Sequence, residues 1–207
     1  MSDVMTPKSP LESVLKPGVH AAPDGATGVS IEERRDVVQL QLIARKDKAA
    51  EAGKAFARFL GQKSALGPLE GAQRNGLLIC ATGPLEHWVF AQGRSPADAI
   101  KELSGIAGAS VSLFDQSTGR CVIRLAGRHA VDVLAKGAPL DLQGDALPAT
   151  GASHTAIGHI PALVCRRTDP PCHDISVPRS YAGSFITWLG GAALEYGYVI
   201  EKPRSGG

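Results

Sequence analysis

The alternation of apolar and polar residues predicts a β-α-β-β-α-β order in the first half of the chain. Strand-like segments of period two flank segments whose apolar residues recur every three or four positions, as in amphipathic helices. The expected elements are strand 37–44, helix 47–61, strands 76–82 and 87–91, helix 95–105 and strand 109–116. Asp47 and Ser95 are expected as helix N-caps, and Gly61 as the end of the first helix.

The same order recurs in the second half, with additional strand material. The expected elements are strand 119–127, helix 128–137, strands 153–160, 161–167 and 173–178, helix 180–197 and a last strand at 198–202. A β-α-β-β-α-β order is that of a ferredoxin-like unit. We therefore expect an α+β fold in which two ferredoxin-like halves, residues 34–116 and 117–201, pack as one domain.

The two ends of the chain lack such patterns. Residues 1–33 contain several Pro and Gly residues, and we expect an extended N-terminal arm that wraps a partner or stays loose, with a short strand at Gly28–Ile31. Residues 202–207 are expected to be a flexible tail. No signal-peptide pattern and no apolar run of about 20 residues is present, which favours a cytoplasmic protein that does not enter a membrane.

Composition narrows the class of partner. The 207 residues carry a net charge of +2, and only 5% of them are aromatic. The basic residues are scattered, so neither a nucleic-acid footprint nor a base-stacking platform is indicated. The four cysteines form no C-x-x-C pair, and we expect them to be free thiols.

No motif predicts a nucleotide, acyl-transfer or metal site. There is no glycine-rich phosphate loop and no G-x-S-x-G sequence. His154 and His159 are five positions apart, which is not a zinc-ligand spacing, and a metal site formed by Cys165, Cys172 and His173 across a hairpin is disfavoured. We therefore predict no catalytic, cofactor-binding or metal-ligating residue in this chain.

Residues 172–174 and Glu195 are the remaining candidates for acid–base chemistry. Cys172 and His173 are adjacent in a predicted strand, so their side chains point to opposite faces and do not form a nucleophile–base pair. Asp174 and Glu195 could act as acid and base, but we expect both to be solvated surface charges.

The long C-terminal helix carries the strongest pattern. Ser180 is expected as its N-cap and Gly197 as its end. An apolar stripe is formed by Tyr181, Phe185, Trp188, Ala192 and Tyr196. Two consecutive mid-helix glycines each cost about 0.8–1 kcal/mol relative to Ala, so another backbone is expected to approach them, from this chain or from another subunit. The predicted packing or interface residues are Tyr181, Phe185, Trp188, Gly190 and Gly191.

Three segments carry a resemblance to a known family. "DQSTGRCVIRLAGRHAVDVLAKGAPLDL" (115–142), "HDISVP" (173–178) and "VPRSYAGSFITWLGGAALEYG" (177–197) resemble the gamma subunit of heterotetrameric sarcosine oxidase. "SPLESVLKPG", "GVSIEE" and "VVQLQLIAR" are similar to the N-terminal segment and first strand of that family. The stretch "ICATGPLEHWVF" departs from the family pattern: Leu85 replaces an acid, and Trp88 stands one place late.

This resemblance implies a fold similar to the folate-binding domain of the glycine-cleavage T-protein. In such complexes the alpha subunit binds NAD and folate, the beta subunit carries FAD and covalent FMN, and the delta subunit holds zinc. The gamma subunit has no cofactor and no catalytic residue. The complex demethylates sarcosine to glycine, producing hydrogen peroxide and 5,10-methylenetetrahydrofolate or formaldehyde.

Three alternatives stay open from the sequence. A gamma-type chain could equally serve a related N-methyl amino acid dehydrogenase, such as N-methylglutamate dehydrogenase. A free-standing folate-binding aminomethyltransferase-like protein would need a pocket with an acidic residue for the pterin. A free-standing thiol enzyme or hydrolase would need a reactive cysteine of low pKa.

Overall fold

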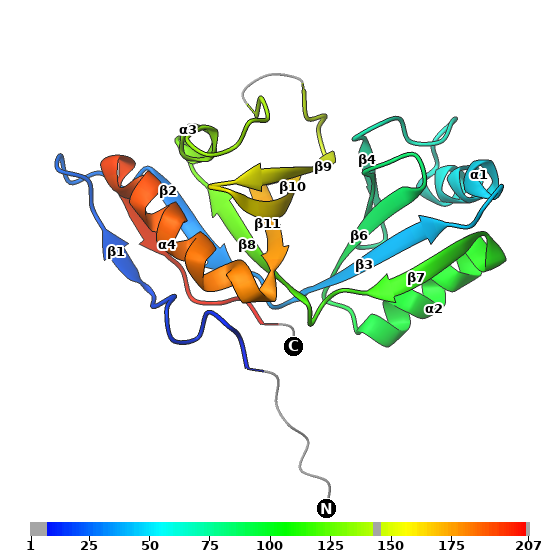
Figure 1. Ribbon diagram of the computed structural model, residues 1–207, viewed down its shortest axis with the longest axis horizontal. Coiled ribbons are helices and arrows are strands. Elements are labelled where there is room, and N and C mark those ends of the chain that lie inside the picture. Colours follow the sequence, from blue (N-terminus) through cyan, green and yellow to red (C-terminus); the bar gives the residue numbers. More distant parts are fainter. Residues whose placement is uncertain (1–7, 143–145, 206–207) are drawn as a thin grey trace, which may run out of the picture.

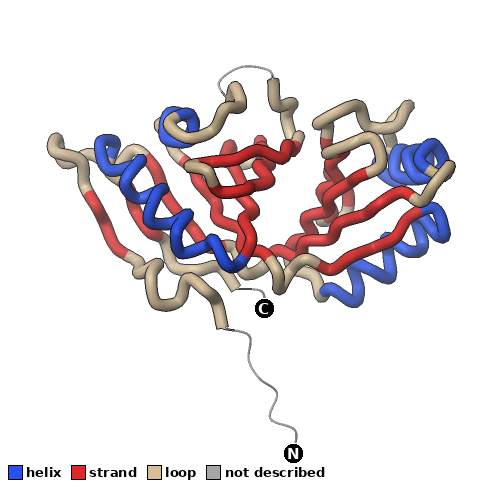
Figure 2. The backbone as a smooth tube through the Cα atoms, in the orientation of Figure 1, coloured by secondary structure: helices blue, strands red, loops and turns tan. Residues whose placement is uncertain are grey.

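The computed structural model describes residues 8–142 and 146–205 and contains two β-sheets that face each other (Figure 1). One sheet has five strands and the other has seven. The sheets form the middle layers, and α1, α2 and α4 lie on the outer sides (Figure 2). The predicted α+β fold of two packed halves is confirmed.

The five-stranded sheet contains the first predicted half. Its elements are β3 (Val37–Ala44), α1 (Ala49–Leu60), β4 (Gly71–Arg74), β5 (Leu77–Ala81), β6 (Glu86–Gln92), α2 (Pro96–Ala107), a 3-10 turn (Gly108–Ser110) and β7 (Val111–Asp115). The strand order β4-β5-β6-β3-β7 is that of an antiparallel ferredoxin-like sheet with β4 added at one edge.

Local signals explain where the two helices of this half begin and end. The Ser95 hydroxyl accepts a hydrogen bond from the Asp98 amide at 3.1 Å, which confirms Ser95 as an N-cap. Gly61 ends α1 in left-handed backbone with φ 71°, also as predicted. Asp47 was wrongly expected to cap α1: it has φ 61°, Lys48 occupies the cap position, and no side chain caps this end.

The seven-stranded sheet contains the second half together with two N-terminal strands. Its elements are β1 (Gly18–His20), β2 (Val29–Glu33), β8 (Arg120–Ala126), α3 (Ala130–Ala135), β9 (Ala152–Ile157), β10 (Ile160–Thr168), β11 (Pro171–Pro178), a 3-10 turn (Arg179–Tyr181), α4 (Ala182–Ala193), a second 3-10 turn (Leu194–Tyr196) and β12 (Tyr198–Ile200). The strand order is β1-β12-β2-β8-β11-β10-β9.

The N-terminal segment is therefore more integrated than an extended arm. β2 lies between β8 and β12 and pairs with both, and Leu11 and Leu15 are buried in the core of this half. The segment after β12 also packs here, since the Arg204 amide donates to the Glu33 carbonyl at 2.9 Å. Strand pairing by β1 and β2 and the burial of Leu11 and Leu15 fix the course of this segment along the seven-stranded sheet.

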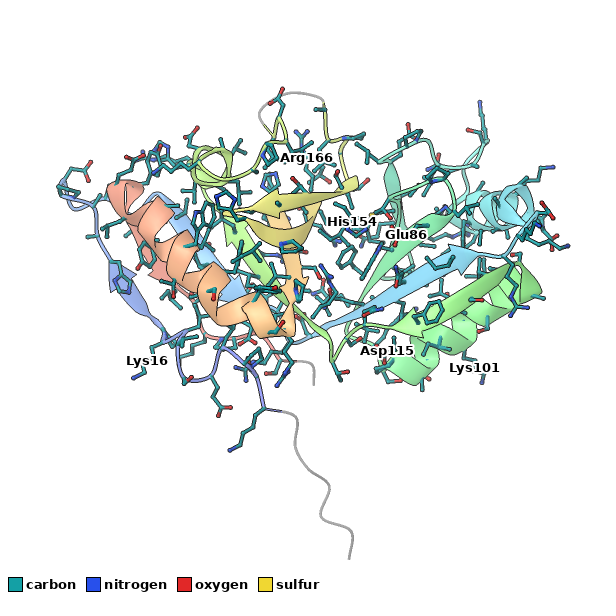
Figure 3. All side chains as sticks on the ribbon, viewed as in Figure 1. Lys16, Glu86, Lys101, Asp115, His154 and Arg166 are labelled. Atoms are coloured by element: carbon teal, nitrogen blue, oxygen red, sulfur yellow. The ribbon has the colours of Figure 1, made fainter. Side chains whose placement is uncertain are left out.

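A third core joins the two sheets. It contains Val37, Leu78, Cys80, Trp88 and Phe90 from one sheet and Val122, Ala152, Leu163 and Cys165 from the other. Polar groups extend this contact. His154 Nε2 of the second half lies 3.0 Å from Glu86 Oε2 of the first, and Figure 3 shows the two side chains where the halves face each other.

Candidate interface on helix α4

Helix α4 buries one face against the seven-stranded sheet. Its buried residues are Ala182, Phe185, Ile186, Leu189 and Ala193. This face is rotated from the predicted stripe, of which only Phe185 is fully buried. The helix begins after a 3-10 turn, and no side chain caps it, so the prediction of Ser180 as N-cap is wrong.

Trp188 lies on the flank of α4 and is partly buried against two glycines. A Cβ atom on Gly137 would lie 2.3 Å from Cζ2 of the indole, and one on Gly158 would lie 2.7 Å from its Cδ1. Both positions therefore require a residue without a side chain. The ring centroids of Trp188 and Phe185 are 6.0 Å apart, so Trp188 extends the core as a packing residue.

Within residues 8–142 and 146–205, no backbone from outside α4 lies against its glycine pair. A Cβ atom on Gly190 would lie 3.2 Å from the hydroxyl of Tyr198, and one on Gly191 would have no non-local atom within 4 Å. Among the described residues, the internal backbone contact that could explain both glycines is not found. Gly191 is exposed and open to a partner.

These glycines line a groove of about 360 Å³ between α4, the strands β1 and β12, and an N-terminal turn. The groove is lined by Ser13, Val14, Leu15, Lys16, His20, Ile31, Ile186, Thr187, Gly190, Gly191, Tyr198 and Ile200. His20 and Tyr198 stack at one side, with ring centroids 4.4 Å apart. Most of the lining is apolar or aromatic, with Lys16 as its one charged side chain.

Exposed apolar side chains lie on the same elements as the groove: the N-terminal turn, β1 and the two ends of α4. Val14 is 50% exposed, Val19 68%, Tyr181 47% and Leu194 56%. β1 is an edge strand that pairs with β12 alone among the described strands, so one side of its backbone is unpaired. Apolar side chains beside an open strand edge are typical of surfaces that bind another chain.

Residues 172–174 serve the fold. Asp174 is buried and accepts two hydrogen bonds from Arg124, at 2.7 and 2.8 Å, so its expected solvated state is wrong. His173 is buried, and burial together with Arg166 lowers its pKa, which keeps the imidazole neutral. Burial raises the pKa of the Cys172 thiol, so this cysteine is a poor nucleophile.

Glu195 and the remaining cysteines are not arranged as reactive groups either. Glu195 forms a surface ion pair with Lys136 at 2.7 Å. Burial and the nearby Glu33 raise the pKa of Cys121 to about 11. A hydrogen bond with Cys80 and burial raise the pKa of Cys165. Within residues 8–142 and 146–205, no three His, Cys, Asp or Glu side chains gather as metal ligands.

Two comparisons with known proteins found no relative of this chain. No model of a protein family matches this sequence, and no curated protein matches it.

In the part of the chain that the structure describes, no helix is long and apolar enough to cross a membrane.

Two solved structures are similar over most of the chain. Glycine cleavage system aminomethyltransferase T from Bartonella henselae matches 96% of this chain with a TM-score of 0.63 and 15% identity. The match covers 60% of that protein, so it supports the T-protein-like fold alone. A chain of heterotetrameric sarcosine oxidase from Corynebacterium sp. U-96, solved in complex with pyrrole 2-carboxylate, matches with a TM-score of 0.72 and 27% identity. That match covers 91% of this chain and 95% of the other, which confirms the predicted resemblance to heterotetrameric sarcosine oxidase.

Proposed function

We propose that this chain is the non-catalytic gamma-type subunit of a heterotetrameric sarcosine oxidase. The observation that carries the proposal is the end-to-end match with a chain of such an enzyme, 91% of this chain against 95% of the other. The match extends over nearly all of both chains, which supports a counterpart of similar size. A domain within a larger catalytic chain would have matched over a smaller share.

The state of the reactive side chains supports a structural role. Cys121, Cys165 and Cys172 have raised pKa values, and Asp174 is held by Arg124. These groups therefore stabilise the fold and are not poised for chemistry. In the proposed complex, NAD, FAD, FMN and zinc are bound by the alpha, beta and delta subunits, and the chemistry of sarcosine demethylation takes place there.

The groove beside Gly191 is the proposed contact with a partner subunit. It combines an exposed glycine, flanking apolar side chains and an unpaired strand edge. A helix or strand of the partner could approach the α4 backbone closely only where Gly191 leaves space. This assignment accounts for a glycine whose position in a helix is otherwise costly.

The proposal is tested by purifying the chain with its native partners and adding sarcosine. We expect sarcosine-dependent hydrogen peroxide formation by the assembly, and a colourless isolated chain without flavin absorbance. Activity on N-methylglutamate in place of sarcosine would identify a related N-methyl amino acid dehydrogenase. Tight binding of tetrahydrofolate by the isolated chain would favour a free-standing folate-binding protein and contradict the proposal.

A further inference from the structure

A second cleft lies where the two halves meet, away from the α4 groove. Its volume is about 470 Å³, and it is bounded by the ends of β2, β3 and β8 and by the start of α2. This volume falls in the range of about 300–1,000 Å³ that is usual for small-ligand sites. Both halves contribute to the lining, so the cleft exists only in the assembled fold.

The cleft concentrates positive charge. Its cationic side chains are Lys8, Arg34, Arg35, Arg94, Arg120 and Arg179. Its carboxylates are only Glu33 and Asp36. The lining therefore carries four more cations than carboxylates, although Glu102 outside it forms an ion pair with Arg94 and Glu32 lies near Arg34.

The two carboxylates of the lining already accept hydrogen bonds from arginines of the same chain. Asp36 receives two hydrogen bonds from Arg34, both at 2.8 Å. Glu33 accepts two hydrogen bonds from Nε and Nη2 of Arg35, at 2.9 and 2.8 Å, and a third from the Ser9 hydroxyl. Neither carboxylate has a contact with Arg120 or Arg179 within ion-pair distance in the described structure.

Arg34 is fully buried and has unused hydrogen-bond donors. Its side chain is 0% exposed, and its Nη1 has no partner among the described residues. Glu32 Oε2 lies 3.8 Å from Nε and therefore offsets charge without reaching Nη1. A buried guanidinium N–H that lacks an acceptor costs free energy, which an oxyanion would recover if it entered the cleft deeply enough to reach Nη1.

Arg120 is a second cation of the lining, and among the described residues no carboxylate lies within ion-pair distance of it, although Glu86 is near enough to act on its charge. Its Nε and Nη2 donate to the hydroxyl and the carbonyl of Ser176 at 2.7 and 2.8 Å, and its guanidinium lies 5.2 Å from the Trp88 ring centroid. These partners are neutral, and no carboxylate of the described chain forms an ion pair with it. Burial lowers the pKa of Arg120, and the charge of Glu86 opposes this effect only in part.

We propose that this cleft binds a small multivalent oxyanion, whose phosphate or carboxylate oxygens accept hydrogen bonds from Arg34 and Arg120. Arg179 stands at the exposed mouth, where it donates to the Lys8 carbonyl and pairs with no described carboxylate. Arginine suits this ligand class because its planar fork matches the geometry of both groups. The inference concerns this chain alone and is independent of its proposed partners.

The test is calorimetric titration of the full chain with inorganic pyrophosphate and, separately, with citrate, at constant ionic strength. We expect one anion per chain and a rise in melting temperature beyond that produced by NaCl at the same ionic strength. The tighter of the two anions identifies phosphate or carboxylate chemistry. Arg120→Gln should weaken binding about tenfold or more, the effect of losing one charge-assisted hydrogen bond.

Two further variants keep the result interpretable. Arg179→Gln changes an exposed side chain and should weaken binding about threefold or more even if Arg120→Gln fails to fold. Arg58→Gln alters an exposed arginine on α1, outside the cleft, and should bind as the unmodified chain does. Stabilisation equal to that by NaCl, or equal loss of affinity in all three variants, would overturn the proposal and leave only general charge screening.

Discussion

The indole of Trp188 lies against Gly137, so closely that a Cβ atom there would be 2.3 Å from Cζ2. This contact joins α4 to the segment that follows α3. We predict that Gly137→Ala destabilises the chain by about 1–3 kcal/mol, because the added methyl group overpacks the site. Trp188→Ala should cost about 2–3 kcal/mol, less than a fully buried Trp, because this side chain is only partly buried.

Combining Gly137→Ala with Trp188→Ala tests whether the two residues are in direct contact. If the two residues meet as described, Trp188→Ala removes the closest contact of the methyl group and leaves only the Gly158 nitrogen at 2.8 Å, so the combined cost falls below the sum of the single costs by about 0.5 kcal/mol or more. Urea denaturation of the unmodified chain, the two single variants and the double variant measures this coupling. Strict additivity would show that the indole does not pack on this glycine.

Gly191→Leu tests the proposed interface. Leucine favours a helix over glycine by about 0.8 kcal/mol, and no non-local atom of the described residues lies within 4 Å of the new Cβ, so the isolated chain should be at least as stable as before. Its bulk should nevertheless weaken assembly with partner chains about tenfold. The measurements are a thermal melt and a pull-down.

Gly105→Leu is the matched control for that variant. Gly105 is an exposed glycine in the last turn of α2, as Gly191 is in α4, and a Cβ atom there also meets no non-local atom of the described residues within 4 Å. It lies outside the groove and should stabilise the chain without affecting assembly. Equal assembly by both variants would mean that Gly191 faces solvent in the complex.

Two buried imidazoles predict a loss of stability in mild acid. Burial lowers the pKa of His87, and burial and Arg166 lower that of His173, both from an ordinary value of 6.5. The unfolded chain therefore binds more protons than the folded chain below this pH, and the stabilisation present above pH 6.5 declines as the pH falls.

Melting temperatures from about pH 7.5 to about pH 5.5 measure this effect, since ordinary carboxylates titrate lower. The double variant His87→Leu, His173→Leu should lose most of the decline. His159→Asn, at an exposed position with φ 66° that Asn tolerates, should retain it. An unchanged decline in the double variant would assign the pH dependence to other groups.

The four cysteines should be inert in the folded chain. All are buried, and the raised pKa values of Cys121, Cys165 and Cys172 disfavour the reactive thiolate. An aromatic disulfide reagent at pH 8 should modify them slowly in the native chain and rapidly in denaturant. Cys172→Ser should leave the turnover of an assembled complex within about threefold. Rapid native labelling or a hundredfold loss of turnover, about 2.7 kcal/mol of barrier, would restore a catalytic thiol as a candidate.

The order of strands and helices could be predicted because in each half strand-like segments with apolar period two alternate with helix-like segments whose apolar residues recur every three or four positions. β4 escaped prediction because it is short and only partly buried, so it has no strong apolar pattern. A signal for it was present: Asn75-Gly76 joins β4 to β5 with φ of 50° and 75°, as a two-residue hairpin turn requires.

The candidate site was harder to predict, because it depends on pairings between distant segments. The groove at Gly191 needs β1, which is only three residues long, and β1 is held by its pairing with β12 at the far end of the chain. Likewise, Asp174 could not be distinguished from a surface charge until β8 placed Arg124 beside it. Sequence periodicity carries no information on such partners.

The most direct test of the central claim is the mass and composition of the assembly formed by the chain in its native cells. We predict that the affinity-purified chain elutes as a yellow complex with three other subunits, and that native mass spectrometry finds one copy of each. Elution of this 21.5 kDa chain alone and colourless, from cells that oxidise sarcosine, would contradict the account.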